Sequence, residues 1–324
     1  MSKSSNKEPS VCVAIAAYNV EDYIEKTIIS ILNQDYHNIK IVVINDGSTD
    51  NTLSILSKFS NKITVISQTN QGLSSVRNKA IKICNTDYLV QIDGDDYVEK
   101  DWIKKCISNM KERKLDLLFF GYNSVDENGR YLKYGIKKEY TDQKVLSKSD
   151  VIYRIATNQM NNYAWSYILK SSVAKEIVQP VFPIGLNFED MAATYKFILN
   201  SNRIGFLSNT YYHYVQRRNS ITKLPSKKEA DDLLKIKDIL NRNINSTINN
   251  NIIKVWNLNI DIARYQILSY FKKTNVSELR DLKKKICSEN QNDLPRVMNI
   301  KIIFIKFGIY KYLYPLLAYL RWKI

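Results

Sequence analysis

The stretch Tyr88-Leu-Val-Gln-Ile-Asp-Gly-Asp-Asp96 joins a short apolar run to three closely spaced carboxylates. The run 88–92 is short and rich in apolar residues, which is typical of a buried strand in a parallel sheet. The acidic residues follow where this strand should end, and Gly94 between them favours a tight bend. The stretch therefore predicts a strand whose C-terminal end carries an acidic turn.

Two interpretations of this acidic turn are open from the residues alone. Like charges this close repel each other unless a cation or strong hydrogen-bond donors compensate, and carboxylate oxygens suit Mg²⁺ or Mn²⁺. The alternative is a solvated turn in which Gly94 makes the bend and Asp96 begins a helix cap. The rest of the chain has to decide between them.

Outward from this stretch, short apolar runs alternate with segments of helical spacing. Runs at 11–17, 39–44 and 63–67 read as further buried strands. The intervening segments place apolar residues on one helical face: Ile24, Ile28 and Ile31; Leu53 and Leu56; Val76, Ala80 and Ile83. This alternation predicts an α/β fold with a mostly parallel sheet flanked by helices on both faces.

Polar clusters follow the C-terminal ends of three of these strands. They are Ala17-Tyr-Asn19, Asn45-Asp-Gly-Ser-Thr-Asp50 and Asp93-Gly-Asp-Asp96. Ligands of open parallel sheets bind beyond the carboxyl ends of the strands. We therefore expect the three clusters to converge on one crevice, although residues 45–50 could also be only a turn in which Ser48 or Thr49 caps the next helix.

Two further pieces complete this set: Ala16, directly before the first cluster, and the segment Gln71-Gly-Leu-Ser-Ser-Val-Arg-Asn78. In this order, the motifs resemble those of the family 2 inverting glycosyltransferases of bacterial surface-polysaccharide type, which have the GT-A fold. The resemblance covers residues 11–123 well and extends more loosely to 222. It implies a Rossmann-like GT-A fold with a nucleotide-binding half at 11–123 and an acceptor half at 124–222. A polar tail at 1–10 would precede this domain, and a helical C-terminal region would occupy 223–324.

The resemblance also implies roles for residues of the nucleotide-binding half. Ala16 and Tyr18 would line the base pocket, with Asn19 beside them. Asp46 would contact uracil or ribose, and Arg77 would contact the nucleotide. Asp93 would lie near the ribose and the donor sugar, and Asp95 together with Asp93 would hold the metal. Without the neighbouring motif, Arg77 would be an ordinary exposed helix arginine.

In the acceptor half, Phe188-Glu-Asp-Met191 resembles the motif whose Asp is the catalytic base. Asp190 is therefore the expected base, and Glu189 would position the acceptor. Two acidic residues at a helix start also complement the helix dipole without any catalytic role. The processive membrane synthases carry Gln-x-x-Arg-Trp, whereas this chain has Gln216-Arg-Arg-Asn-Ser220, which argues against that class.

Two further residues have both a functional and a structural interpretation. His213 could complete the metal shell or touch phosphates together with Arg217 or Arg218, or it could be an ordinary packed histidine. Trp165 could stack on the acceptor sugar or simply pack in the core.

The net charge of +16 implies an acidic partner, which could be nucleic acid, an anionic membrane surface or a phosphorylated substrate. The chain shows no zinc-ligand spacing, no RNP-like motif and no basic region with heptads, so nucleic acid is not expected. A sugar-phosphate nucleotidyltransferase stays open as an enzymatic alternative, although no Gly-rich phosphate loop follows the first strand.

The ends of the chain and its cysteines bear on location. Four cysteines without a CxxC pair predict reduced thiols in the cytosol, and residues 1–10 lack the apolar segment of a signal peptide. The stretch 299–324 is apolar and aromatic but carries lysines and Pro315, and its longest uncharged run is too short to span a bilayer. It should either pack on the catalytic domain or lie in the membrane interface, peripheral to the inner face of the cell membrane.

Taken together, the residues and the resemblance predict a metal-dependent hexosyltransferase that uses Mn²⁺ or Mg²⁺. The donor would be a UDP-hexose or UDP-N-acetylhexosamine. The acceptor would be a glycan hydroxyl on a surface polysaccharide or on a lipid-linked chain such as an undecaprenyl-diphosphate glycan. An oligomer is compatible with the sequence.

Overall fold

A computed structural model of the chain describes residues 8–132, 144–217, 225–244, 248–271, 276–290 and 294–309. The chain forms two compact units. The first, which we call the sheet unit, comprises 1–148, 162–185 and 193–216. The second, the helical unit, comprises 149–161, 186–192 and 217–324. Residues 149–161 and 186–192 therefore group with the C-terminal helices, across the boundary at 222 that the sequence suggested.

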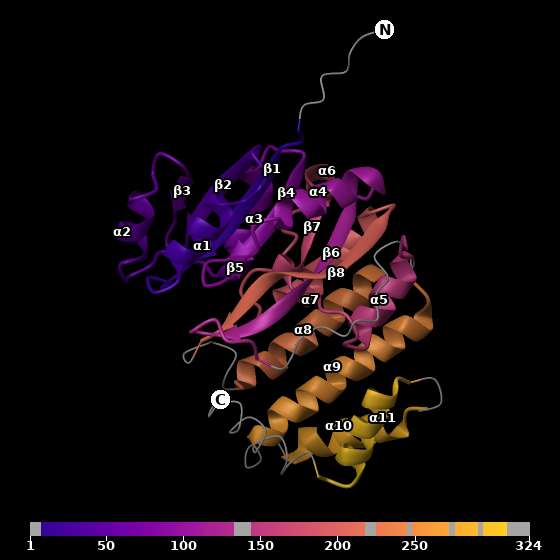
Figure 1. Cartoon of the computed structure of the whole chain (residues 1–324). Coiled ribbons are helices and arrows are strands. Elements are labelled where there is room, and N and C mark those ends of the chain that lie inside the picture. The colour runs from indigo at the N-terminus through magenta and orange to yellow at the C-terminus, as the bar shows by residue number, and fades with distance from the viewer. Residues whose placement is uncertain are drawn as a thin grey trace. The chain divides into compact units, whose positions relative to one another are not determined.

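The sheet unit is built on one mixed sheet with strand order β3-β2-β1-β4-β7-β6-β8-β5 (Figure 1). The strands are β1 Val11–Ala17, β2 Ile39–Asn45, β3 Thr64–Ser67, β4 Tyr88–Asp93, β5 Tyr97–Val98, β6 Leu117–Asp126, β7 Tyr167–Lys170 and β8 Ile204–Gln216. The β3-β2-β1-β4 half is parallel throughout. Antiparallel pairs occur where β7 joins β4 and β6 and where β5 joins β8.

The parallel half forms because its strands are apolar on both faces. Nearly every residue of β1 is buried, as are the last five residues of β2 and the first five of β4. Helices on the two faces of such a sheet remove these strands from water, so the strands show continuous apolar runs and not an alternation. The helices of this unit are α1 Ile24–Leu32, α2 Thr52–Ser57, α3 Leu73–Ile83, α4 Trp102–Glu112, α6 Ser171–Lys175 and, from residue 193, α7 Glu189–Asn200, with a 3-10 turn η1 at Ala164–Ser166.

The register of the parallel strands brings their C-terminal ends together. Ala17 of β1 pairs with Asn45 of β2, and Ala16 pairs with Asp93 of β4. The three polar clusters of the sequence therefore start from neighbouring positions at one edge of the sheet. The expected convergence is confirmed.

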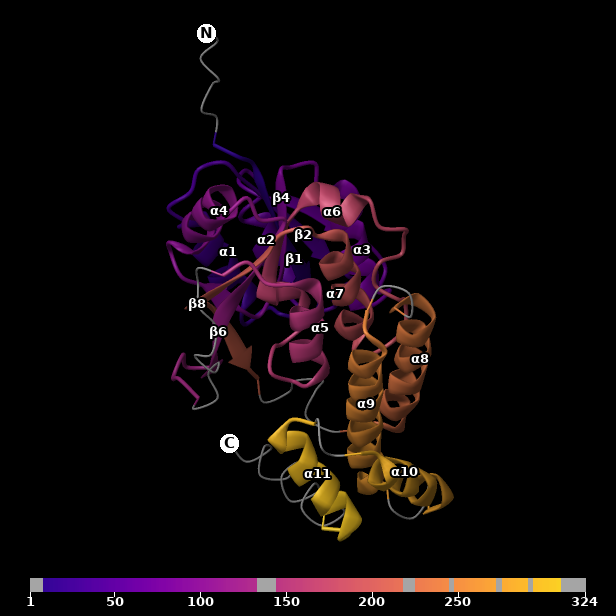
Figure 2. The same ribbon diagram turned by 90° about the vertical axis from the view of Figure 1, so that its right-hand side faces the viewer.

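The helical unit contains α5 Lys148–Ala156, α8 Lys227–Ile244, α9 Asn250–Tyr270, α10 Val276–Ser288 and α11 Arg296–Lys306. Figure 2 shows α8 and α9 side by side, and α9 also contacts α10 and α11. Each helix buries an apolar face; on α9 this face includes Trp256, Ile260 and Leu268. None of the described helices is long and apolar enough to cross a bilayer.

Two expectations about the chain need correction or restriction. Cys12 and Cys84 form a disulfide, so the expectation of reduced thiols throughout is wrong for this pair; Cys106 and Cys287 are free. The two bonded cysteines are 72 residues apart in sequence, and only the packing of α3 against β1 makes them neighbours. At the C-terminus, α11 accounts for the start of the stretch 299–324, while Pro315 lies outside the described residues.

Candidate functional site

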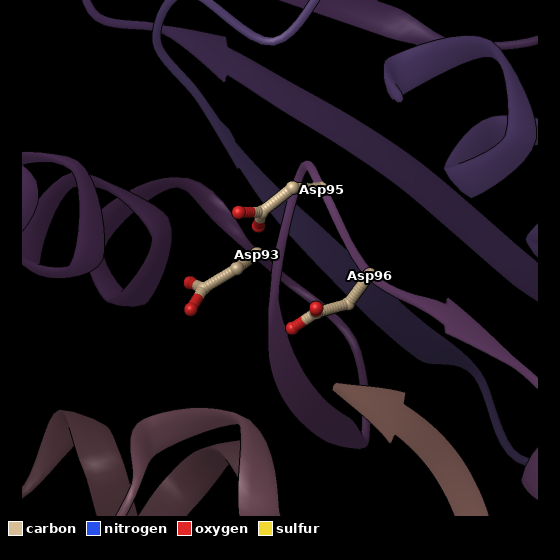
Figure 3. A group of neighbouring side chains, drawn as sticks. All are labelled: Asp93, Asp95 and Asp96. Carbon is tan, nitrogen blue, oxygen red and sulfur yellow. The ribbon is translucent and has the colours of Figure 1, made fainter. Parts of the chain in front are cut away.

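Three carboxyl groups cluster at the C-terminal end of β4. Asp93 is the last residue of β4, Asp95 lies in the following turn, and Asp96 precedes β5. Oxygens of the three side chains lie within 4.8 Å of one another, on the same side of the turn (Figure 3). An all-oxygen set of this kind suits a hard divalent cation such as Mg²⁺ or Mn²⁺. The residues therefore fit the expected metal.

Asp96 differs from the other two acids because its carboxylate is buried and bound by protein donors. The Tyr212 hydroxyl donates to Oδ2 at 2.6 Å, and the Val215 backbone N–H donates to Oδ1 at 2.8 Å. Burial, and then the charges of Asp95 and Asp93, raise the pKa of Asp96 well above its usual range. Asp96 does not cap a helix, since α4 begins only at Trp102. Asp93 and Asp95 are thus the better placed cation ligands.

The backbone of this acidic turn is fixed to β1 and α1. The Thr27 hydroxyl lies 2.9 Å from the carbonyl oxygen of Gly94 and 2.6 Å from that of Asp96. The Gly94 N–H donates to the Ala16 carbonyl at 2.8 Å. A Cβ atom on Gly94 would lie 2.7 Å from that same oxygen, so the close approach to β1 needs glycine. Ala16 therefore positions the turn through its backbone.

Arg77 lies next to the acidic turn and is buried. Its Nη2 atom is 3.4 Å from Asp93 Oδ1, and its guanidinium carbon is 5.6 Å from the centre of the Phe182 ring. The alternative of an exposed helix arginine is therefore wrong, because α3 turns this residue inward. A buried cation beside Asp93 balances part of the negative charge of the cluster.

Asp46 and Asn19 hold loops at the same edge of the sheet. The Asp46 carboxylate accepts hydrogen bonds from Gln68 Nε2 at 2.7 Å, from the Gln71 N–H at 3.0 Å and from the Gly72 N–H at 2.8 Å. These bonds fix the chain just before α3. Asn19 Oδ1 accepts from the Thr49 N–H at 2.8 Å. Both side chains thus fix the loops that follow β1, β2 and β3.

Tyr18 is the exposed member of this group. Its side chain is 43% exposed just beyond the end of β1, whereas Asp46 is buried. An exposed ring at this edge has room for a planar ligand, so the expectation that Tyr18 contacts a base is compatible with its position.

His213 is not part of the carboxyl cluster. Its Nε2 atom lies 2.7 Å from Glu99 Oε1, and its ring stacks on Tyr97 at 4.4 Å between ring centres. Side chains alternate along β8, so Tyr212 faces Asp96 while His213 points to the opposite face. The structure does not bring His213 to the metal ligands that the resemblance implies.

Trp165 is only 3% exposed and lies inside an aromatic cluster. Its ring stacks on Tyr212 at 4.5 Å and on Tyr163 at 4.7 Å between centres. Tyr163 is 41% exposed, which makes it the accessible ring of this stack. Sequence reasoning missed Tyr163 and Tyr212, although the alternation in Tyr211-Tyr-His-Tyr214 could have placed Tyr212 and His213 on opposite faces of a strand.

The expected base, Asp190, and two of the expected acceptor residues, Glu189 and Arg217, belong to the helical unit. Glu189 and Asp190 form the first turn of α7 and are half-buried. The preceding residues are tied to α8 because the Asn187 N–H donates to Asp232 Oδ2 at 3.0 Å. Arg217 directly follows β8, and Arg218 lies outside the described residues. The roles of these side chains stay predictions.

Comparison with known proteins identifies relatives of the chain. The sequence profile of glycosyl transferase family 2 matches residues 12–166. GlyA, a glycosyltransferase of Streptococcus pneumoniae, is 29% identical over 68% of this chain. The match spans only 32% of the length of GlyA. GlyG of the same organism is 25% identical over 84% of this chain and 93% of its own length.

A solved structure confirms the expected GT-A architecture. The crystal structure of residues 1–349 of Staphylococcus aureus TarS, in complex with UDP-GlcNAc, superposes with a TM-score of 0.61. The superposition covers 96% of this chain and 89% of that one, at 21% sequence identity. At this identity the likeness concerns the fold.

Proposed function

The chain belongs to glycosyl transferase family 2, and on that premise we propose that it transfers a hexose or N-acetylhexosamine from a UDP-sugar to a glycan hydroxyl, with inversion at the anomeric carbon. One observation carries this proposal. The Asp93, Asp95 and Asp96 carboxyls gather beside buried Arg77 at the C-terminal edge of a parallel sheet, where α/β proteins bind nucleotides. The TarS structure, solved with UDP-GlcNAc, supports a UDP-sugar donor.

Asp95 and Asp93 would hold a divalent cation, Mn²⁺ or Mg²⁺. When bound, such an ion neutralises charge on the diphosphate as UDP leaves. Arg77, 3.4 Å from Asp93, adds a buried positive charge next to the carboxyl cluster. Tyr18 would contact the base as an exposed ring, while Asp46 and Asn19 would act by holding the loops that surround the nucleotide.

Asp190 would accept the proton of the attacking hydroxyl. Its carboxylate lies in the first turn of α7, and a carboxylate is one of the side-chain groups that act as general bases. Glu189 and Arg217 would orient the acceptor. Aromatic stacking on a sugar would fall to exposed Tyr163, because Trp165 behind it is buried.

The acceptor would be a surface polysaccharide or a lipid-linked glycan, such as one on undecaprenyl diphosphate. The name of the relative TarS, a poly(ribitol-phosphate) beta-N-acetylglucosaminyltransferase, supports a polymeric acceptor. We propose a peripheral location at the inner face of the cell membrane, in accordance with the basic net charge of +16.

The test compares two variants with the wild type. Asp95→Asn should lose Mn²⁺-dependent binding of UDP together with transfer, because it removes a metal ligand. Asp190→Asn should bind UDP with unchanged affinity but transfer at least about a hundredfold more slowly, the low end of what a general base contributes. Binding is measured by calorimetry, and turnover by UDP release from UDP-glucose, UDP-galactose and their N-acetyl forms, with and without Mn²⁺.

Three outcomes would contradict the proposal. Unchanged turnover of Asp190→Asn would exclude it as the base, and unchanged metal dependence of Asp95→Asn would exclude it as a metal ligand. Release of pyrophosphate from UTP in place of UDP from a UDP-sugar would favour the sugar-phosphate nucleotidyltransferase.

A further inference from the structure

Helix α11, Arg296–Lys306, is apolar on two opposite faces. Met298, Ile302 and Ile305 form the buried face within the helical unit, where α11 contacts α9 and α10. On the opposite side, an outer stripe is made of apolar residues spaced three or four apart. These residues and their exposed fractions are Val297 at 53%, Ile300 at 41%, Ile303 at 43% and, just past the helix end, Phe307 at 72%.

Single exposed apolar residues are common on protein surfaces, but an aligned stripe is not. The spacing of three and four keeps all four side chains on one side of the helix. An apolar face that runs along the length of a helix is normally covered by protein or lipid. The outer stripe of α11 therefore indicates a surface that is covered in use.

The charge around the stripe identifies the kind of cover. Arg296 and Lys306 are exposed at the two ends of the helix. From residue 296 to the end at 324 the sequence holds six Lys or Arg and no Asp or Glu. A second copy of the chain would bring the same positive charge to the interface and be repelled. The apolar stripe calls for an apolar partner surface, and the basic residues around it call for a negatively charged one. An anionic lipid bilayer has both properties.

We propose that the outer stripe of α11 inserts into the interfacial region of an anionic bilayer, with the helix axis parallel to the membrane. The apolar side chains would enter the boundary between headgroups and acyl chains, and Arg296 and Lys306 would contact the headgroups. The inference deepens the peripheral location in the proposed function. Vesicle binding is measured without UDP-sugar or acceptor, so its failure and a failure of the transfer reaction are distinguishable.

The test is sedimentation of the full chain with vesicles of phosphatidylcholine alone or mixed with phosphatidylglycerol. Ile303→Glu is compared with Leu234→Glu, which changes an equally exposed residue, 43%, on α8 of the same unit. Ile303→Glu should weaken binding to anionic vesicles by roughly tenfold or more, since it removes an apolar contact and adds a like charge. Leu234→Glu should bind within about twofold of the wild type, because its single added charge lies away from the lipid.

A third variant separates apolar from electrostatic effects. Ile303→Ser leaves the net charge unchanged and should still weaken binding severalfold, because it removes only the apolar contact. Vesicles of phosphatidylcholine alone should bind the wild type much more weakly than anionic ones. Melting temperatures of all variants show that they are folded.

Three results would overturn the proposal. The first is equal binding by the Ile303 and Leu234 variants. The second is a wild-type dimer in light scattering that Ile303→Glu dissociates, which would make the stripe an interface between copies. The third is a lower melting temperature of Ile303→Glu with unchanged vesicle binding, which would mean that the chain itself covers the stripe.

Discussion

The Tyr212 hydroxyl joins the acidic turn to β8. It donates to Asp96 Oδ2 at 2.6 Å and accepts from the Asp93 N–H at 3.2 Å. Burial, and then the charges of Asp96 and Asp93, raise the pKa of Tyr212 well above its usual range, so the phenol keeps its proton. At the residue scale, Tyr212 and Asp96 act together as a support for the turn that carries Asp93 and Asp95.

Tyr212→Phe should therefore affect both stability and metal binding. The substitution leaves the buried Asp96 carboxylate without one donor, which should cost about 1–3 kcal/mol in the free energy of unfolding. It should also weaken Mn²⁺ activation, because the turn carrying Asp95 loses an anchor. Urea unfolding and a Mn²⁺ titration of UDP release measure the two effects.

Tyr270→Phe is the matched control, since this tyrosine is 40% exposed near the end of α9. It should change neither quantity. If Tyr212→Phe lowers stability but leaves the Mn²⁺ titration unaltered, Tyr212 serves the core only and does not position the turn.

At the scale of elements, α9 is tied to its neighbours by a buried ionic cluster. Asp261 on α9 accepts from Lys237 of α8 at 2.7 and 2.6 Å, and Lys285 of α10 lies 3.0 Å from it. The Lys237 and Asp261 side chains are almost completely buried. One carboxylate thus fixes three helices, and the pairing offsets the cost of burying its charge.

Asp261→Asn should destabilise the helical unit strongly. Removing one partner of a buried pair leaves the Lys237 ammonium without compensation, which typically costs about 3–5 kcal/mol. Asp150→Asn makes the same change in a more exposed pair with Arg154 on α5, in which the side chains are 39% and 26% exposed, and it should cost under about 1 kcal/mol. Urea denaturation followed by far-UV circular dichroism compares them, and equal losses would show that burial does not govern these pairs.

At the scale of the whole molecule, the net charge of +16 should make membrane binding depend on salt. The Debye length falls from about 10 Å at 0.1 M to about 3 Å at 1 M ionic strength, so the electrostatic part of binding is screened. Wild-type binding to anionic vesicles should therefore weaken at 1 M NaCl but not vanish, because insertion of the outer stripe does not depend on charge. The residual binding should be severalfold weaker in Ile303→Ser, because one of the four apolar side chains of the stripe is removed. Residual binding that is equal in both proteins would contradict this division.

The parallel half of the sheet could be predicted because its determinants are local. Runs such as 11–17 and 88–92 are apolar on both faces, and the polar clusters directly follow the strands. Strand direction then places Asn19, Asp46 and Asp93 at one edge without further information. Asp93, Asp95 and Asp96 are adjacent in sequence, so their clustering needed little tertiary structure.

The remaining site residues could not be located in this way, because their environment comes from distant segments. Arg77 is buried by packing of α3, and Asp96 by contacts to Tyr212 and Val215 more than a hundred residues away. Side chains alternate along β8, so the side chain of Tyr212, and not that of His213, contacts the acidic turn. The sequence by itself thus determined the fold class and the acidic turn, since both rest on near neighbours in the chain. Tertiary structure alone decided which acid is buried and which aromatic ring is exposed, because burial depends on which distant elements cover a side chain.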